Sequence, residues 1–252
     1  MAETTSEQKG AGPESRGGRP ALEAHLAMAA LTALLLLWYR DIIQFWRVEW
    51  SGNAGYYSHG PIVPVLAAII VWTQRERLAG APVAASGWGI VVLALGGLLK
   101  IGSTWVSTSG VEAFASVAFP ILLWGLILGV YGRAFAHILA GPVAFLWLMC
   151  PLPGYAITEV SFPLQLISTR MGATLAGLAG VSVYQEGTAI HLPMLSLFVG
   201  EACSGFRSIL ALMTLSAFAA ATSRLEWAQK ALVLLAAIPI ALGANAVRIA
   251  SI

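Results

Sequence analysis

Runs of about twenty apolar residues recur along this chain, and they constrain the fold more than any other feature of the sequence. The clearest lie at residues 111–131 and 227–249, where charged side chains are few. A helix of roughly 20 apolar residues crosses the roughly 30 Å hydrocarbon core of a bilayer. Over the whole chain only 10% of residues are charged, whereas a soluble domain carries about 25%. The chain is therefore predicted to be an integral membrane protein.

Seven membrane spans are predicted from these runs and from the polar breaks between them. Their approximate bounds are residues 22–46, 61–74, 87–105, 111–131, 133–150, 202–221 and 227–249. Residues 158–180 are different, because they keep a helical period but carry Glu159, Gln165 and Arg170. Such a segment favours an amphipathic helix at the membrane interface over a further span.

The N-terminal segment differs from the rest of the chain in composition. Residues 1–20 are rich in Gly, Ser, Glu and Arg, and they offer no apolar surface that could offset the entropy lost on folding. They are predicted to be a disordered cytoplasmic tail. Residues 21–252 carry no internal repeat, and they are predicted to form a single transmembrane domain.

The segment at residues 181–200, VSVYQEGTAIHLPMLSLFVG, is β-branched and aromatic, with turn signals at QEG and LPM. This pattern predicts a small hairpin or a three-stranded meander. The strands have to lie outside the bilayer, because an open sheet edge cannot face lipid. The expected fold class is an all-α polytopic membrane protein with one small extracytoplasmic β-hairpin before the cysteine helix.

Basic residues set the predicted orientation. If residues 158–180 do not cross the membrane, the positive-inside rule makes one side cytoplasmic, and that side carries Lys9, Arg16, Arg19, Arg75, Arg77, Arg133, Arg224 and Lys230. Arg40 and Arg47 are exceptions. The meander and the motif GEACSGFRS at residues 200–208 then face the periplasm or the cell exterior. The expected localisation is a multi-pass protein of the plasma (inner) membrane.

Cys203 is the strongest candidate for a reactive group. The predicted span places it at the start of a helix, where free N–H groups and a partial positive charge favour a thiolate. Arg207, one turn further on, would favour the thiolate further, and Glu201 lies in the predicted cap region. Most free cysteines are instead small buried hydrophobes, and Arg207 can also snorkel to the interface. Cys150 ends a predicted helix, so it is predicted to be a packing residue.

Asn245 and Arg248 lie three residues apart on one face of the last predicted span. Cys203 is about 22 residues before the inner turn near Leu225 and Arg248 about 23 residues after it, so each lies roughly 33 Å from that turn. Two antiparallel helices would thus bring the thiol and the guanidinium to one level, unless Arg248 only anchors the outer end of its helix. A thiolate beside an arginine suits acyl transfer, because the arginine can stabilise the oxyanion.

Other functional groups are scarce. Acyl transfer from an amide also needs a general acid. The candidates on the predicted outer side are His59 and His191, but each is more typical of a structural histidine. His25 and His137 lie toward the inner side. A disulfide between the two cysteines is compatible with the topology but would remove the nucleophile. No metal cluster, phosphate loop or cofactor motif is visible, and a net charge of +2 without a basic stripe does not favour nucleic-acid binding.

The motifs GEACSGFRS and ANAVRI, separated by one span and a short basic turn, resemble the exosortase/archaeosortase family of multispanning membrane enzymes. The segments YYSHGPIVPVL, FLWLMCPLP and STRMGATLAGLAGVSVYQEGTAIHLP are similar to further family segments, so the resemblance covers roughly residues 56–252. It implies a cysteine transpeptidase of the PEP-CTERM-type sorting system. Such an enzyme acts on exported proteins with a C-terminal signal of a Pro-Glu-Pro-type motif, a transmembrane helix and a basic tail.

The resemblance implies that Cys203 is the nucleophile and Arg248 the motif arginine of a site that forms a thioester, which an unidentified surface acceptor resolves. Glu201, Ser204, Arg207 and Asn245 complete the predicted site as supporting residues. The family has eight spans and a third residue, a histidine or arginine, on a helix after NxxRI. The sequence to Ile252 lacks that helix, so a truncated chain is expected.

Two other functions fit some of the same residues. A membrane transferase could load an acyl or glycolipid group through Cys203 without processing a protein. A non-enzymatic component of a polysaccharide-export or surface-assembly system would keep the membrane fold and leave the thiol inert. In every case the expected partners include membrane lipids and exclude nucleic acid.

Overall fold

The computed structural model of the protein describes residues 18–52, 55–105, 110–200 and 203–251. Within these ranges the first part of the chain is helical. Its elements are α1 (Gly18–Trp38), α2 (Arg40–Ser51), α3 (Ile62–Thr73), α4 (Arg75–Ala79), α5 (Trp88–Ser103), α6 (Val111–Val130), α7 (Arg133–Phe145) and the short 3-10 helix η1 (Leu146–Met149).

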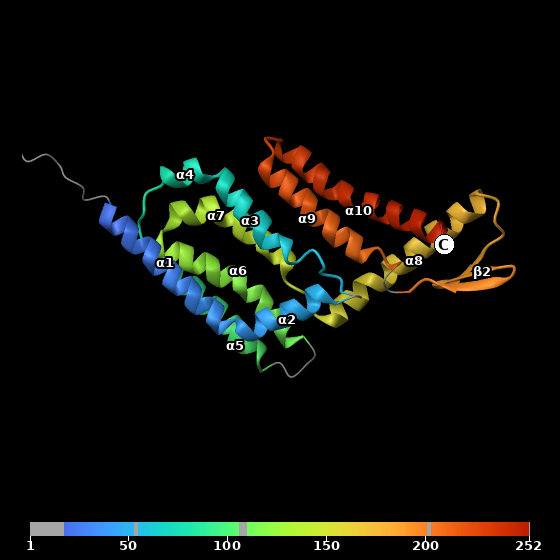
Figure 1. Ribbon diagram of the computed structural model, residues 1–252, viewed down its shortest axis with the longest axis horizontal. Helices are drawn as coiled ribbons and strands as arrows, with labels where there is room; N and C mark the ends of the chain where they lie inside the picture. The colour runs from blue at the N-terminus through green and yellow to red at the C-terminus, as the bar shows by residue number, and fades with distance from the viewer. Residues whose placement is uncertain (1–17, 53–54, 106–109, 201–202, 252) are drawn as a thin grey trace, which may run out of the picture.

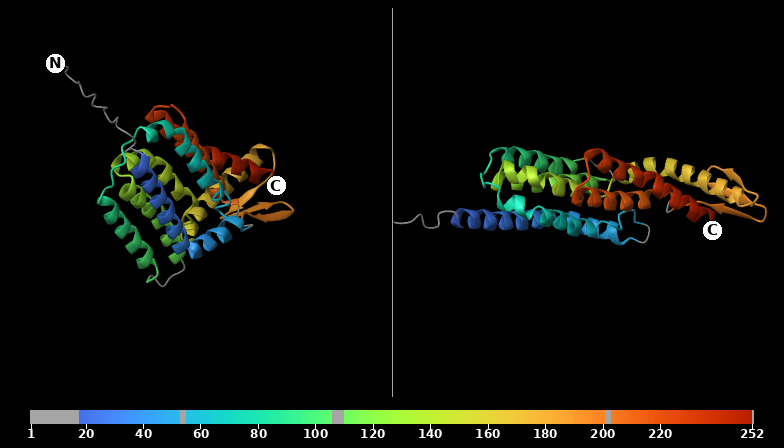
Figure 2. Two further views of the ribbon diagram at one scale, coloured as in Figure 1. Left: turned by 60° about the vertical axis from the view of Figure 1, so that its left-hand side comes forward. Right: turned by 90° about the horizontal axis from the view of Figure 1, so that it is seen from above.

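The second part of the chain combines three helices with a small sheet. Its elements are α8 (Gly154–Leu178), β1 (Tyr184–Glu186), β2 (Ala189–Leu192), β3 (Leu195–Phe198), α9 (Phe206–Thr222) and α10 (Trp227–Ala250). The first part forms two layers, with α1, α2 and α3 in one and α5, α6 and α7 in the other (Figure 2). The helical hairpin of α9 and α10 lies beside α8 at the end of the molecule that carries the sheet (Figure 1).

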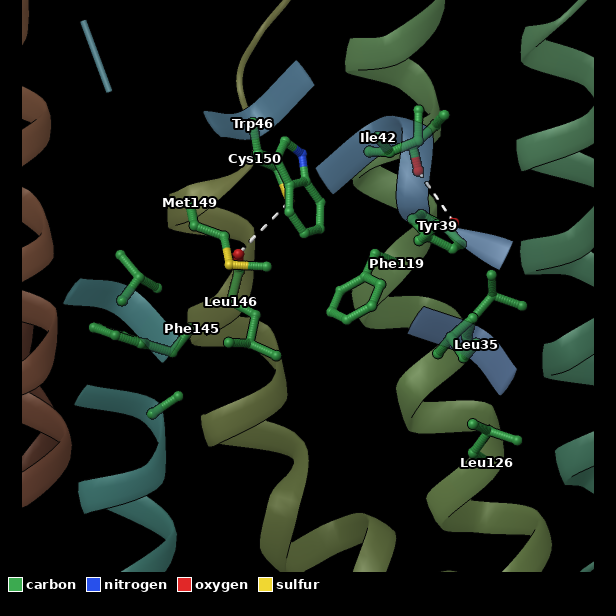
Figure 3. Close-up of a cluster of buried hydrophobic side chains, with 14 of the residues drawn as sticks. Leu35, Tyr39, Ile42, Trp46, Phe119, Leu126, Phe145, Leu146, Met149 and Cys150 are labelled. Atoms are coloured by element: carbon green, nitrogen blue, oxygen red, sulfur yellow. Dashed lines mark hydrogen bonds between the residues drawn. The ribbon is translucent and has the colours of Figure 1, made fainter. Parts of the chain in front are cut away.

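The core between the two layers is built around aromatic rings (Figure 3). The ring of Phe119 on α6 meets those of Tyr39 and Trp46 edge to face, with centroid distances of 5.2 and 5.3 Å. The polar tips are satisfied as well: the Tyr39 hydroxyl donates to the Ala115 carbonyl at 3.2 Å, and the Trp46 indole N–H donates to the Ser116 hydroxyl at 2.7 Å. Burying these rings fixes α1 and α2 on α6.

The predicted first span, residues 22–46, is not one straight helix. It breaks at Tyr39, and α1 and α2 meet at a bend of 68°. The charged residues Arg40 and Asp41 follow the break and are exposed, while α2 buries Ile42 and Trp46. The bend has a physical reason: it keeps the apolar face of α2 on the core and turns its charges away.

The number of membrane crossings follows only partly from helix length. Helices α6 and α10 are long and apolar enough to cross a bilayer alone, and the described residues offer up to four spans if each of two bent helix pairs counts as one. Helices α3, α5 and α9 are apolar but shorter; the twelve residues of α3 extend about 18 Å. The predicted count of seven stays a prediction for these short helices.

The helix predicted at residues 158–180 forms as α8 and is bent by 81° from residues 133–149. The side chains of Glu159 and Arg170 are exposed, as an interfacial helix would have them. Gln165 is buried instead, together with other polar residues of α8. Its polarity marks a contact inside the protein rather than a solvent-facing surface, which the sequence pattern alone does not distinguish.

Of the two forms predicted for residues 181–200, a hairpin and a three-stranded meander, the structure has the meander. Strands β1, β2 and β3 form an antiparallel sheet in chain order, with Gln185 opposite Ile190 and Ile190 opposite Leu197. The turn between β1 and β2 contains Gly187 with a φ of +59°, a conformation that glycine adopts without strain. The sheet leads the chain from the end of α8 back to the segment that carries Cys203.

Candidate active site

Cys203 lies on a tight turn before α9, not in the first turn of the helix as predicted. Its N–H donates to the carbonyl of Gly200 at 2.9 Å, and α9 begins only at Phe206. The Ser204 hydroxyl accepts from the N–H of Phe206, the first residue of α9, at 3.3 Å, which satisfies one of the free N–H groups at the start of the helix. We call residues Cys203, Ser204 and Gly205 the cysteine turn.

Two helices hold this segment through its carbonyl groups. From α8, the amide of Gln165 donates to the Val199 carbonyl, and the hydroxyl of Ser168 donates to the Ser204 carbonyl at 3.2 Å. From α10, the amide of Asn245 donates to the Cys203 carbonyl at 2.5 Å. All three donor side chains are buried. A buried carbonyl left without a donor costs about 1–3 kcal/mol, so these bonds favour a single conformation of the turn.

Gly205 allows Asn245 to approach the turn. Its φ of +81° lies in the left-handed region, which strains any residue with a Cβ. A Cβ at this position would also lie 3.3 Å from Nδ2 and 3.4 Å from Cβ of Asn245. The glycine of the motif is therefore required both by the backbone and by the neighbouring helix.

The two cysteines have different surroundings, and both thiols are free. Cys203 is half-buried and packs against a small cluster that includes Ala173 of α8 and Ile249 of α10. Cys150 is buried in the core between the layers, where its thiol donates to the Ser116 carbonyl at 3.3 Å. Cys150 is thus a packing residue, as predicted, and Cys203 keeps part of its surface open.

Arg248 lies one helical turn beyond Asn245 and is exposed. Residues three apart on a helix have their Cβ atoms about 5–6 Å from each other. The bond between Asn245 and Cys203 therefore brings the segment of α10 that carries Arg248 beside the cysteine turn. This bond agrees with the prediction from sequence that Cys203 and Arg248 lie at the same level relative to the turn near Leu225. A contact between the thiol and the guanidinium stays a prediction.

The remaining predicted site residues lie around the same turn. Arg207 is the second residue of α9 and half-buried. The sequence placed it one helical turn beyond Cys203, but Cys203 precedes α9, so the two residues are not related by a turn of that helix. Ser204 is buried, and its hydroxyl accepts from the Phe206 N–H. Glu201 lies outside the described residues.

The loop with the motif YYSHGP packs against the start of α9. The rings of Tyr56 and Phe206 meet edge to face with centroids 5.5 Å apart. In the same loop, the ring of His59 is hydrogen-bonded through Nε2 to the Leu148 carbonyl at 3.1 Å. Burial lowers the pKa of His59 below its ordinary value, although the bond to the carbonyl opposes this shift.

The other outward histidine belongs to the sheet. The Nδ1 atom of His191 lies 2.8 Å from the Ser196 hydroxyl, and its Nε2 lies 3.7 Å from a carboxylate oxygen of Glu186. These contacts join β2 to both neighbouring strands. His191 and His59 each contact other parts of the fold, in agreement with the structural role expected for them.

Sequence reasoning did not identify Gln165 and Ser168 as part of the site. A signal was present: Gln165, Ser168, Thr169 and Gly172 are small or polar and follow a helical spacing of three and four. They form a buried stripe, and a Cβ on Gly172 would lie 2.6 Å from the Ile249 side chain on α10. A polar stripe on a membrane helix indicates packing against another part of the protein.

Comparison with known protein families identifies a relationship. The family model of transmembrane exosortases matches residues 46–252. No curated protein and no solved structure matches the chain. The matched region contains the loop around His59, the cysteine turn and Arg248. Since the match covers most of the sequence, the chain belongs to the transmembrane exosortase family.

Proposed function

We propose that this chain is a membrane thiol transpeptidase that cleaves the C-terminal sorting signals of exported proteins. One observation carries the proposal: the half-buried Cys203 sits on a turn whose carbonyls are bound by buried side chains of two other helices. A cysteine that only packs does not need its backbone held by such hydrogen bonds, whereas a nucleophile gains from a fixed position relative to its substrate. Family membership supports the same chemistry.

The reaction would proceed through a thioester. The sulfur of Cys203 forms a bond to the scissile carbonyl carbon, and the C–N bond then breaks. The leaving amine takes up one proton, whose net source is the thiol. An acceptor nucleophile or water then attacks the thioester carbonyl, gives up a proton and restores the thiol. Arg248 is proposed to stabilise the negative charge on the carbonyl oxygen in both steps.

The supporting residues are proposed to act on Cys203 rather than on the substrate. Asn245 and Ser204 fix the turn through the bonds described above. Arg207, at the start of α9, is proposed to favour the thiolate together with the positive end of the helix. Glu201 is proposed to orient a neighbouring cation.

The proposed setting is the plasma (inner) membrane, with residues 21–252 as one transmembrane domain and residues 1–20 as a cytoplasmic tail. The sheet has open edges, so it belongs in water, and the cysteine turn follows it directly. The active site would therefore face the periplasm or cell exterior. Its protein substrate would arrive there with its own transmembrane helix still in the bilayer.

The proposal is tested by co-expressing this chain with a tagged exported protein that ends in a sorting signal. The wild-type chain is expected to shift the tagged protein to a smaller size on a gel. The C203A variant should abolish the shift, and C150A, the matched control, should retain it. Processing that persists in C203A would refute the thiol mechanism. A properly inserted wild-type chain that processes no cognate substrate would favour the non-enzymatic alternative.

A further inference from the structure

We propose that a groove along α6 and α7 binds an anionic phospholipid. Two neighbouring cavities, of about 430 and 190 Å³, form this groove, and they share Trp124 and Ala140 in their walls. The larger cavity is lined by Trp88 of α5 and by Arg133 and His137 of α7. The smaller one continues to Trp147 of η1. We call the two cavities together the α6–α7 groove.

The groove is separate from the aromatic core and from the cysteine turn. Helix α6 directs Phe119 and Leu126 into the core between the layers and Trp124 into the groove. The indole N–H of Trp124 donates to the Ala136 carbonyl at 3.0 Å. Its polar atom is therefore satisfied within the protein, and the ring offers the groove an apolar surface.

The ionisable side chains that line the groove are all basic. Arg133 and His137 lie four residues apart, hence on one face of α7, and both are exposed. Neither forms an ion pair with another described residue, and no acidic side chain lines either cavity. A guanidinium can bind two phosphate oxygens at once, and a histidine ring N–H can donate to a third. This end of the groove fits the phosphate of a lipid headgroup.

The length of the groove fits one lipid leaflet. From Arg133, Ala140 lies about 10 Å along the helix and Trp147 about 21 Å. One leaflet measures roughly 20–22 Å from the headgroup region to the bilayer centre, of which roughly 15 Å is hydrocarbon. A lipid with its phosphate at Arg133 would therefore lay its acyl chains over Trp124 and Ala140 and reach the region of Trp147. The Trp88 ring, 59% exposed at the same end as Arg133, lies where tryptophan favours the interface.

The positive charge at Arg133 favours an anionic lipid over the other apolar molecules that a membrane offers. A zwitterionic lipid would place its own cation near Arg133 and gain less. A sorting-signal helix would bring a basic tail, which Arg133 would repel. The observations therefore favour a lipid with net negative charge, such as phosphatidylglycerol. This inference does not depend on the proposed enzymatic reaction.

Native mass spectrometry of the purified full chain in a neutral detergent tests the inference. Phosphatidylglycerol and phosphatidylcholine with identical acyl chains would be titrated in parallel, with inorganic phosphate as a third arm. Wild-type protein is expected to bind one phosphatidylglycerol at least tenfold more tightly than phosphatidylcholine. The R133Q/H137Q double variant should lose this preference. R224Q, which removes an exposed arginine from the turn between α9 and α10, should keep it.

Three results would overturn the inference. The first is equal binding of the two lipids by wild-type protein. The second is an equal loss of preference in R133Q/H137Q and R224Q, which would indicate a diffuse basic surface rather than a site. The third is displacement of the lipid by millimolar inorganic phosphate, which would identify a phosphate site without an acyl component. A W124A variant tests the acyl-chain contact separately. It removes the apolar ring and leaves Arg133 in place, so it should weaken the binding of both lipids.

Discussion

The side-chain amide of Asn245 donates a hydrogen bond to the carbonyl oxygen of Cys203 at 2.5 Å, although the two residues lie 42 positions apart in the chain. Asn245 is buried on α10, and Cys203 is half-buried on the turn before α9. The bond links the motif of the predicted nucleophile to the motif of the predicted arginine. The two motifs therefore form one structural unit, and most of the following tests act on it.

Replacing Asn245 with aspartate should strongly impair processing while changing side-chain shape little. Aspartate cannot donate to the Cys203 carbonyl, and its charge would be buried beside that oxygen. We expect sorting-signal cleavage to fall at least 100-fold in N245D and about tenfold in N245A. Gel-shift rates measured with equal amounts of inserted chain check this. A rate in N245A equal to that of the wild type would show that the bond does not position the nucleophile.

Ser168 tests the contribution of α8. The S168A variant removes the donor to the Ser204 carbonyl and should reduce the free energy of unfolding by about 1–2 kcal/mol. Cleavage should slow several-fold. The matched control is T174V on the same helix, whose exposed hydroxyl donates only to the Arg170 carbonyl. Equal effects of S168A and T174V on cleavage would contradict a specific role for Ser168.

Gly205 should not tolerate a side chain. In G205A the added Cβ meets Asn245 and forces a left-handed backbone on alanine, so we expect a loss of about 1–3 kcal/mol in the free energy of unfolding. G141A is the control, because a Cβ on this helical glycine meets no atom within 4 Å. It should be neutral or slightly stabilising. Chemical unfolding in mixed micelles measures both variants, and similar stabilities for the two would argue against the close packing at Gly205.

Stability should depend on pH through His59. Burial lowers the pKa of His59 in the folded protein, while the unfolded chain keeps a value of about 6.5. As the pH falls through that value, the unfolded state takes up a proton that the folded state does not, so stability decreases on acidification. Thermal unfolding between pH 8 and pH 5 should show this decrease in the wild type and a smaller one in H59Q, which keeps an amide donor for Leu148. Superimposable profiles would exclude His59 as the source.

The two thiols should differ in reactivity. A membrane-impermeant maleimide added to intact cells should label the C150A chain at Cys203, because this thiol is half-buried and proposed to face outward. The C203A chain should be labelled only after unfolding, since Cys150 lies in the core. Labelling of Cys203 only after the membrane is permeabilised would reverse the proposed orientation.

Several features were predictable from sequence because they depend on residues close together in the chain. The apolar runs predicted at 111–131 and 227–249 correspond to the helices Val111–Val130 and Trp227–Ala250, which are long enough to cross a membrane. The alternation of β-branched and turn residues identified the meander, whose strands pair with their immediate neighbours. The spaced motifs around Cys203 and Arg248 pointed to the family that the comparison then matched.

Only the tertiary structure decided the form of the candidate site. The bonds that fix the cysteine turn join residues 36 and 42 positions apart, and a local sequence pattern cannot identify such pairs. The sequence extended the helix back over Cys203, because residues 202–221 are continuously helix-compatible. In the structure the carbonyls of Cys203 and Ser204 bind Asn245 and Ser168 instead of continuing a helix. The sequence determined which segments are apolar and where the cysteine and the arginines stand along them. Long-range hydrogen bonds decided where the helix begins and how the segment that carries the thiol is held.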